Sequence, residues 1–282
     1  MQILKEKDAL KKLVKALKNE RKSIGFVPTM GALHEGHLSL IKQSLSSCDK
    51  TVVSIFVNPT QFDNPADLEK YPRTLKDDVS KIQSLSPEVI VFTPTATEIY
   101  GDQISSEEFS FDGLEHQMEG RFRKGHFNGV GTIVKKLFEM VEPDRAYFGE
   151  KDFQQLQIIR KLVEKNSLDV EIIGCPIYRE YNGLARSSRN ERLSPDARQN
   201  AAFIFQTLQK VKDDFGTKSA SEITTWVSEV FKAQPGFELE YFEIADSETL
   251  ESMKDRGSNH KYRAFIAAYS GEIRLIDNIA LN

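Results

Sequence analysis

Two histidines near the N-terminus have a spacing suited to phosphate chemistry. His34 and His37 flank Gly36 and follow a short apolar run, residues 24–27, that ends in a Pro/Gly turn. Apolar residues at helical spacing begin at position 38, so the pattern predicts a strand, a glycine-containing loop and a helix. The first turn of a helix binds anions, because its N–H groups lack partners and its dipole is positive there. We therefore interpret the histidines as groups that stabilise a phosphate while it gains charge in a reaction.

The histidine pair by itself also fits simpler arrangements. In one of them, a histidine caps the helix and the other lies on the surface, which is the commoner situation for an arbitrary pair. A zinc site of the H-E-x-x-H type needs its second histidine four positions after the first, whereas His37 is three positions after His34. The motif alone leaves the cap interpretation open and disfavours zinc.

Two side-chain amides follow the β-branched run of residues 51–57. Asn58 and Gln61 are uncharged, so they suit a ligand with hydroxyl groups and a carboxylate that must stay ionised. Asn58 precedes a proline, and ordinary turn chemistry also explains it. Gln61 is not a turn former and is the stronger candidate.

Two later segments carry cations. Lys151 lies in the segment 149–155, which follows a predicted strand and opens a helix, and its ammonium group suits phosphate oxygens. The segment 186–190 combines serine hydroxyls with guanidinium groups, a mixture that a triphosphate requires. A solvated lysine beside a helix cap at Asp152, and a surface turn at 186–190, are the alternatives.

Other patterns carry less weight. Asp77 and Asp78 could hold a metal ion, although an acidic pair in a first helical turn more often stabilises the helix dipole. Residues 123–129 form a basic, glycine-bearing loop. The pattern Gly129-Val130-Gly131 at its end lacks the third glycine of a dinucleotide fingerprint, which argues against that kind of site. The chain has no G-x-x-x-x-G-K-[ST] phosphate loop. Nucleotide chemistry without such a loop is the remaining prediction.

The first 176 residues predict a scaffold that brings these groups together. β-Branched runs alternate with amphipathic helical stretches, as in an open parallel sheet with helices on both faces. Ligands of such sheets bind beyond the carboxyl ends of the strands, where these motifs lie. The predicted strands are 24–27, 51–57, 89–92, 145–148 and 170–173, and the predicted helices are 5–20, 74–85, 130–141 and 153–164, with 101–128 irregular.

Residues 177–282 have a different pattern and predict a smaller α+β domain. Residues 195–213 and 221–233 are expected to form helices, whereas 239–244 alternates like a half-exposed strand. Two further strands, 262–269 and 273–276, are expected to pair as a hairpin.

Bulk composition excludes several classes of protein. A net charge of −4 over 282 residues argues against a general nucleic-acid or membrane binder. No segment approaches the ~18 apolar residues that a spanning helix needs, and the N-terminus lacks the apolar core of a signal peptide. Cys48 and Cys175 are far apart, as expected of reduced thiols in a cytoplasmic protein.

Taken together, the motifs resemble the pantothenate synthetase family over essentially the whole chain. The resemblance also indicates the wider superfamily of nucleotidyltransferases that share His-x-Gly-His, with a Rossmann-like first domain. The segments that carry it are 28–37, 57–62, 71–74, 125–127, 148–156, 187–190 and 274–278.

The resemblance implies an ATP-dependent ligase that condenses pantoate with β-alanine and uses Mg²⁺. Pantoate would attack the α-phosphate to form pantoyl adenylate, and the β-alanine amine would then displace AMP. A carboxylate attacks a polyphosphate poorly because like charges repel, so the site must neutralise the triphosphate and hold the reactants in line.

The resemblance also implies roles for individual residues. His37, His34, Lys151 and Arg189 would be catalytic, with His37 the usual proton donor, and Gln61, Gln155 and Asn58 would bind pantoate, Gln61 also lying near β-alanine. The metal candidate is Asp77. The second domain would close over the ATP site, whose residues would be Met30, Gly31, Ala32, Leu33, His34, Glu35, Gly36, His37, Gly149, Glu150, Lys151, Asp152, Tyr178, Arg186, Ser187, Ser188 and Arg189.

The chain departs from the family pattern at three positions. Arg186 stands where the family usually has an apolar residue, Asn182 where it has Asp, and Lys124 where it has Pro. These departures concern loop geometry. The resemblance further implies a homodimer built through the first domain.

Two alternatives remain. Another nucleotidyltransferase, related to aminoacyl-tRNA synthetases, would need an anticodon-binding domain or a basic RNA face, and the charge balance supplies neither. A nucleotide-binding regulator would bind ATP without forming AMP, which the presence of His34, His37 and Lys151 argues against.

Overall fold

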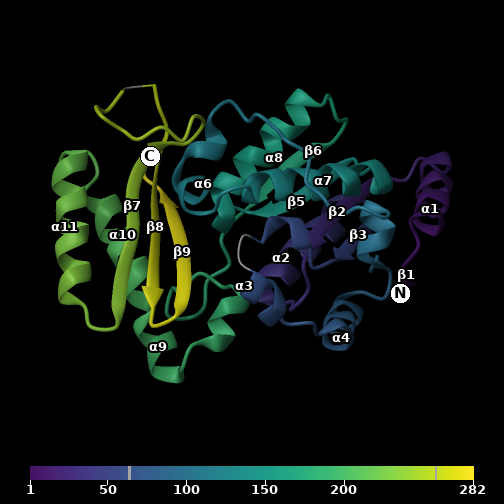
Figure 1. The fold of residues 1–282 in the computed structure, drawn as a ribbon, viewed down its shortest axis with the longest axis horizontal. Helices are drawn as coiled ribbons and strands as arrows, with labels where there is room; N and C mark the ends of the chain where they lie inside the picture. Colours follow the sequence, from purple (N-terminus) through teal and green to yellow (C-terminus); the bar gives the residue numbers. More distant parts are fainter. Residues whose placement is uncertain (63–64, 258) are drawn as a thin grey trace. The chain divides into compact units, whose positions relative to one another are not determined.

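The computed structural model describes residues 1–62, 65–257 and 259–282, which fold into two compact units (Figure 1). The first unit comprises Met1–Glu115, Glu119–Glu150 and Gln155–Pro176. The second comprises His116–Met118, Lys151–Gln154 and Ile177–Asn282. Lys151 therefore belongs to the second unit, although the predicted first domain, 1–176, included it.

The first unit is built on a six-stranded sheet in which every pairing is parallel. The strand order is β1-β4-β3-β2-β5-β6, which confirms the predicted open parallel sheet. Because all strands point the same way, the loops after β2, β3, β4 and β5 leave from one edge. The strands are β1 (Gln2–Leu4), β2 (Ile24–Thr29), β3 (Lys50–Ile55), β4 (Ile90–Phe92), β5 (Arg145–Gly149) and β6 (Glu171–Cys175).

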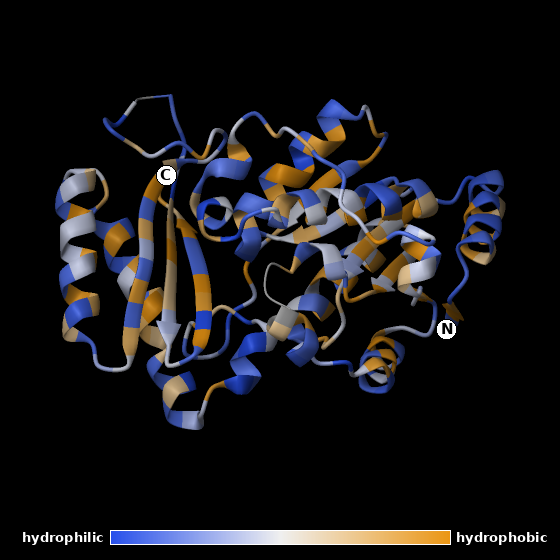
Figure 2. Cartoon of the chain, in the orientation of Figure 1, coloured by the Kyte–Doolittle hydropathy of each residue, from blue (hydrophilic) through white to orange (hydrophobic). Residues whose placement is uncertain are grey.

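Helices cover both faces of this sheet. The side chains of each strand alternate between the two faces, so neighbouring residues contact different helices. Val27 packs in one cluster with Ile41 of α2 and Ile82 of α4. The neighbouring Phe26 contacts Phe138 of α7 edge to face. Figure 2 shows α1 with hydrophilic and hydrophobic residues on different sides, as its inward-facing leucines require. The helices and short 3₁₀ turns are α1 (Lys7–Asn19), α2 (Glu35–Ser47), η1 (Pro59–Gln61), α3 (Pro65–Lys70), α4 (Leu75–Leu85), α5 (Ala96–Tyr100), η2 (Leu114–His116), α6 (Met118–Phe122), α7 (His126–Val141), η3 (Glu150–Asp152) and α8 (Phe153–Lys165).

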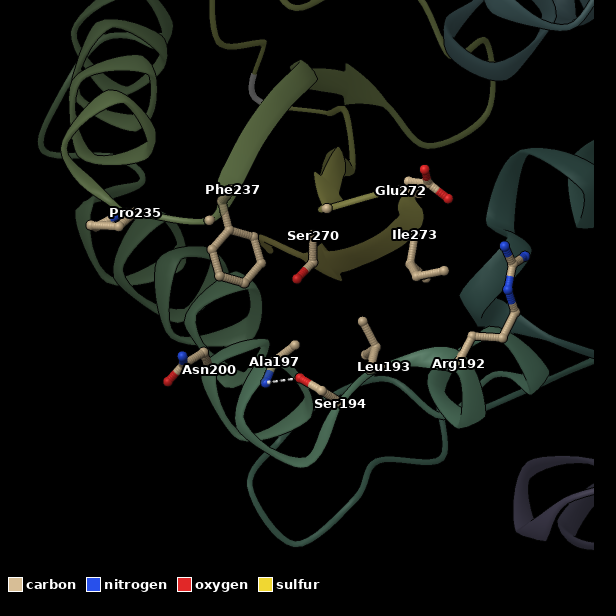
Figure 3. Close-up of a pocket in the computed structure, with 12 residues that line it drawn as sticks. Arg192, Leu193, Ser194, Ala197, Asn200, Pro235, Phe237, Ser270, Glu272 and Ile273 are labelled. Carbon is tan, nitrogen blue, oxygen red and sulfur yellow. Dashed lines mark hydrogen bonds between the residues drawn. The ribbon is translucent and has the colours of Figure 1, made fainter.

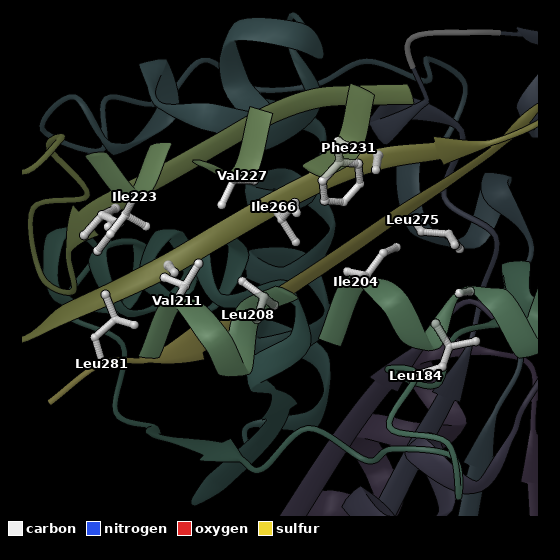
Figure 4. Packing of buried hydrophobic residues seen from close by; sticks show 14 of the residues in the cluster. Leu184, Ile204, Leu208, Val211, Ile223, Val227, Phe231, Ile266, Leu275 and Leu281 are labelled. Atoms are coloured by element: carbon white, nitrogen blue, oxygen red, sulfur yellow. The ribbon is translucent and has the colours of Figure 1, made fainter. Parts of the chain in front are cut away.

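The second unit has an antiparallel sheet, β7-β8-β9, with two long helices packed against it. Figure 4 shows its core, in which residues of α10 and α11 meet Ile266 of β8 and Leu275 of β9. The predicted hairpin between β8 and β9 is present. The elements are η4 (Ser188–Arg192), α9 (Pro195–Asn200), α10 (Ala202–Asp214), α11 (Ala220–Ala233), β7 (Phe237–Asp246), β8 (Tyr262–Ser270) and β9 (Ile273–Ala280).

The structure differs from the predicted elements in several places. Residues 101–128, expected to be irregular, contain η2 and the short helix α6, and the helices α3 and α5 were not predicted. The helix predicted over 195–213 is two helices, because a tight turn at Ala201, closed by the bond from the Ile204 N–H to the Ala201 carbonyl, ends the first. Helix α7 begins at His126 rather than near Val130, since Gly125 adopts the left-handed conformation that caps it. Strand β1 was not predicted because three residues carry no periodicity.

Among the residues that the structure describes, no helix is both long enough and apolar enough to cross a membrane.

Candidate active site

The loop that joins β2 to α2 is held in shape from a distant helix. Gly31 has φ +84°, and a side chain there would approach Asp78 Oδ2 to 3.0 Å, so only glycine fits without strain. Asp78 of α4 is fully buried, and its carboxylate accepts hydrogen bonds from the N–H groups of Ala32 (3.0 Å) and Leu33 (2.7 Å). Lys81, one turn later, donates to the Leu33 carbonyl. Helix α4 therefore supports the loop with a carboxylate and a cation, a role that the sequence did not reveal.

The two predicted histidines lie against each other at the start of α2. Their ring centroids are 4.0 Å apart, with the planes tilted by 35°. His34 caps the helix through its Nδ1, which accepts from the Gly36 N–H at 3.2 Å, and the His34 N–H donates to Nδ1 of His37 at 3.3 Å. With both Nδ1 atoms accepting, each neutral ring carries its hydrogen on Nε2, the tautomer that donates to an oxygen of a ligand. The cap and the catalytic interpretation thus describe the same residue.

The loop after β3 is fixed by a network of amide hydrogen bonds. Asn58 is 1 % exposed, and its Nδ2 donates to Gln61 Oε1 (3.1 Å) and to the Gly129 carbonyl (3.2 Å). Tyr100 donates its hydroxyl to Asn58 Oδ1. Gln61 in turn directs its Nε2 at Met30 Sδ, 3.1 Å away. Two predicted segments, 28–37 and 57–62, therefore meet within the first unit.

The predicted basic loop at 123–129 contacts the loop after β3, which carries Asn58 and Gln61. His126 forms a hydrogen bond with the Gln61 carbonyl through Nδ1 (2.9 Å), and Arg123 bonds its other ring nitrogen (3.0 Å). A Cβ at Gly129 would lie 2.1 Å from the Thr60 carbonyl oxygen, so this glycine permits the close approach of α7 to η1. The sequence suggested only a basic loop here, and the glycine's role is apparent from the packing.

Three further predicted residues of the first unit lie where β5 ends. Gly149 is the last residue of β5, and a Cβ built there would have no neighbour within 4 Å. Glu150 is half-buried in the turn that follows, and Gln155 is half-buried in the first turns of α8.

The remaining predicted residues belong to the second unit. Lys151 and Asp152 lie in η3, with Lys151 Nζ 3.6 Å from Asp152 Oδ1. Lys151 therefore precedes α8 and does not share a face of that helix with Gln155. Tyr178 is 43 % exposed, and its carbonyl accepts from the Arg186 N–H.

Arg186 forms ion pairs within the second unit. Its guanidinium contacts Glu180 (3.4 Å) and Glu191 (2.6 Å). Arg186, which stands where the family usually has an apolar residue, thus has two carboxylate partners in this chain. Ser187 donates its hydroxyl to Oδ1 of the buried Asn190 at 2.7 Å, which shapes the loop that also carries Ser188 and Arg189.

Glu180 organises this loop. Its carboxylate accepts two hydrogen bonds of 2.8 Å from Arg198 and one from the amide of Asn190 at 3.0 Å. Burial alone would raise the pKa of Glu180, but the hydrogen bonds from Arg198 and Asn190 and the charges of Arg198 and Arg186 bring that pKa below its ordinary value. Glu180 is therefore ionised at neutral pH. The sequence did not single it out.

A cavity of about 510 Å³ in the second unit contains none of the predicted site residues. It lies between Leu193 and Ser194, the turn before Phe237, and the β8–β9 hairpin (Figure 3). The Ser194 hydroxyl there caps α9 by accepting from the Ala197 N–H.

Asp77 and Asp78 have different surroundings. Asp77 is exposed in the first turn of α4, whereas Asp78 is used by the loop after β2. No group of three or more His, Cys, Asp and Glu side chains with metal-binding geometry occurs in the described ranges. Mg²⁺ bound with a nucleotide commonly uses one or two carboxylates plus phosphate oxygens, and the exposed carboxylate of Asp77 fits that mode.

Comparison with known proteins gives full-length matches. The family model for pantoate-beta-alanine ligase matches residues 2–280. The pantothenate synthetase of Christiangramia forsetii is 61% identical over 282 residues, covering 100% of both chains. That of Flavobacterium psychrophilum is 59% identical over 281 residues, also covering 100% of both.

Solved structures agree with these relatives. The pantothenate synthetase of Thermus thermophilus has a TM-score of 0.91 and 37% identity, covering 100% of this chain and 99% of the other. The pantoate-beta-alanine ligase of Francisella tularensis, complexed with beta-gamma ATP and beta-alanine, has a TM-score of 0.82 and 36% identity, covering 100% and 98%. The matches extend over both units.

Proposed function

This chain belongs to the pantoate–β-alanine ligase family, and from that premise we propose how its residues carry out the reaction. The chain is an ATP-dependent ligase that joins pantoate to β-alanine and forms pantothenate, AMP and diphosphate. The two half-reactions and the residues that serve them are the proposal.

In the first half-reaction, a pantoate carboxylate oxygen forms a bond to the α-phosphorus of ATP. The bond from that phosphorus to the bridging oxygen breaks, and diphosphate leaves with the electron pair. Negative charge is redistributed over the phosphoryl oxygens as this happens, so donors aimed at those oxygens lower the barrier. We assign Nε2–H of His37 and of His34 to this task.

In the second half-reaction, the β-alanine amine attacks the acyl carbon of pantoyl adenylate. The carbon–oxygen bond to AMP breaks, and the amine nitrogen loses its proton as the amide forms. We assign Gln61 and Gln155 to pantoate, with Gln61 also near β-alanine. Asn58 acts with Gln61, whose amide oxygen it holds at 3.1 Å.

Residues 30–37 and 149–150 of the first unit are assigned to ATP. Lys151 and Arg189 of the second unit are assigned to phosphate oxygens, with Asp152, Tyr178, Ser187 and Ser188 nearby in sequence. Arg186 is assigned to the same loop, and its pairing with Glu180 and Glu191 supports a role in loop shape. Mg²⁺ bound at Asp77 would neutralise phosphate charge.

The observation that carries the site assignment is the contact of Gln61 with Met30, since it joins the amide segment to the loop that bears both histidines. Isotope exchange between diphosphate and ATP tests it. The exchange should require pantoate and should fall about 10²–10³-fold in His37→Ala, the usual cost of removing one such donor. Exchange without pantoate, or an unimpaired variant, would contradict the proposal.

Compartment and assembly complete the proposal. We propose a cytoplasmic enzyme, since Cys48 and Cys175 are both free thiols. We also propose a homodimer, which sedimentation of the purified chain tests.

A further inference from the structure

Two adjacent residues of β9, Asp277 and Asn278, contact the backbone of Lys151 and the hairpin that precedes residues 187–189. They belong to the terminal motif, residues 274–278, which resembles the family but has no role in the proposed reaction. Because neighbouring strand residues point to opposite faces, Asp277 and Asn278 reach different partners.

Asn278 binds the backbone of Lys151 directly. Its Nδ2 donates to the Lys151 carbonyl oxygen at 2.9 Å, and its Oδ1 accepts from a guanidinium nitrogen of Arg263. Asn278 is 2 % exposed, so its amide is oriented by protein partners rather than by solvent. A buried amide with both ends engaged has one stable orientation.

The residues that follow Lys151 are held on the same face of the sheet. Arg263 stacks its guanidinium over Phe153, 3.9 Å from the ring centroid. Phe153 also contacts Phe265, with ring centroids 6.0 Å apart, and Phe265 pairs with Asn278 in the β8–β9 register. The backbone after Lys151 is therefore anchored to β8 and β9 at more than one point.

Asp277 binds the hairpin that leads into the other basic segment, residues 186–190. Arg179 donates to both oxygens of the buried Asp277 carboxylate, at 2.6 and 3.0 Å, and also to the Gly183 carbonyl at 3.0 Å. Arg179 lies in a small hairpin closed by the bond from the Arg186 N–H to the Tyr178 carbonyl, and this hairpin leads into residues 187–189.

We propose that Asn278 is a positioning residue for Lys151, and that β9 thereby fixes Lys151 relative to the segment that carries Arg189. The inference rests on the proposed function, in which both cations bind phosphate oxygens of ATP. A triphosphate that reacts in line needs its cations at fixed separation, and a small displacement costs a large part of the rate. Asn278 and Asp277 supply that fixed separation from a single strand.

The test compares substitutions that remove different contacts of Asn278. Asn278→Asp keeps an acceptor for Arg263 but has no N–H for the Lys151 carbonyl. Asn278→Ala removes both contacts and serves if the aspartate variant does not fold. The matched control is Asn282→Ala, which also removes two amide hydrogen bonds at the end of this sheet, to Tyr262 and His260, without any contact to Lys151.

We expect kcat/KM for ATP to fall about 10- to 100-fold in Asn278→Asp, while KM for pantoate stays within about twofold. Asn282→Ala should leave both constants near those of the unsubstituted enzyme at a comparable shift in Tm. In a Lys151→Ala background, Asn278→Asp should have little additional effect, since both changes act on one group. If Asn278 contributed only to the general structure, the fold-changes of the two substitutions would multiply in the double variant.

Three results would overturn the inference: unchanged ATP kinetics in the folded Asn278 variants, an equal loss for pantoate, or full multiplication with Lys151→Ala. The single variant Lys151→Ala separates these from a failure of the proposed function. If it alone leaves ATP kinetics intact, the role assigned to Lys151 is wrong. If it is impaired while the Asn278 variants are normal, only the positioning role fails.

Discussion

The imidazole rings of His34 and His37 lie with their centroids 4.0 Å apart, each accepting a backbone hydrogen bond through Nδ1. Because Nδ1 is used in this way, the donor that each neutral ring offers to a ligand is Nε2–H. The three-residue spacing therefore caps α2, and the same two rings are the ones proposed to bind phosphate.

Removal of either histidine should lower the exchange rate, and removal of His34 should also lower the stability of the protein. We expect His37→Ala and His34→Ala each to lower ATP–diphosphate exchange about 10²–10³-fold. His34→Ala should also lower the stability of the protein by about 1 kcal/mol, because it removes the cap of α2. Thermal unfolding beside the exchange assay checks this. A His34→Ala variant as stable as the unsubstituted protein would contradict the capping role.

Asp78 and Asp77 provide a matched pair on α4. Asp78→Asn should raise KM for ATP and destabilise the protein by about 1.5–3 kcal/mol, since a carboxylate that accepts from two loop N–H groups becomes neutral. Asp77→Asn, at an exposed position, should change stability by less than about 0.5 kcal/mol. Urea unfolding and a titration of activity with Mg²⁺ distinguish them. A higher Mg²⁺ requirement in Asp77→Asn is expected if Asp77 holds the ion.

Tyr100 should affect pantoate rather than ATP. Burial raises the pKa of its phenol, and the group donates to Asn58, which holds Gln61. Tyr100→Phe removes that donor and should raise KM for pantoate about fivefold, the equivalent of a ~1 kcal/mol hydrogen bond. Tyr181→Phe is the control, because Tyr181 is 92% exposed. A similar change in KM for ATP would show that Tyr100 does not act through Gln61.

Glu180 should make the second unit sensitive to acid. Its folded-state pKa is below the ordinary value of 4.5, so its contribution to stability is present above pH 4.5 and is lost as the pH falls through the folded-state pKa. Glu180→Gln should cost about 2 kcal/mol at pH 7, because Arg198 and Arg186 lose a charged partner.

The same variant should show a weaker decline of Tm between about pH 7 and pH 3 than the unsubstituted protein. Glu191→Gln, whose side chain is 60% exposed, should keep the normal decline. Parallel pH profiles for the Glu180 variant and the unsubstituted protein would rule out this linkage.

The sequence determined the parallel sheet and the segments that line its carboxyl edge. Residues 51–57 are a nearly continuous β-branched run, which is typical of a strand covered on both faces. The polar residues that come next therefore lie in the loop at the carboxyl end of that strand. His34 and Gln61 were identified from local spacing and residue type. Such signals depend on neighbours in the chain, so the sequence alone contains them.

Only the tertiary structure decided which distant groups hold those segments. Asp78 binds Ala32 from another helix, Gly129 admits Thr60, and Asn278 reaches the Lys151 carbonyl. Each of these contacts joins residues far apart in the chain, and each depends on how whole elements pack. An aspartate in a first helical turn has the same local pattern whether it stabilises a dipole or supports a loop, so its role is settled by folding rather than by sequence.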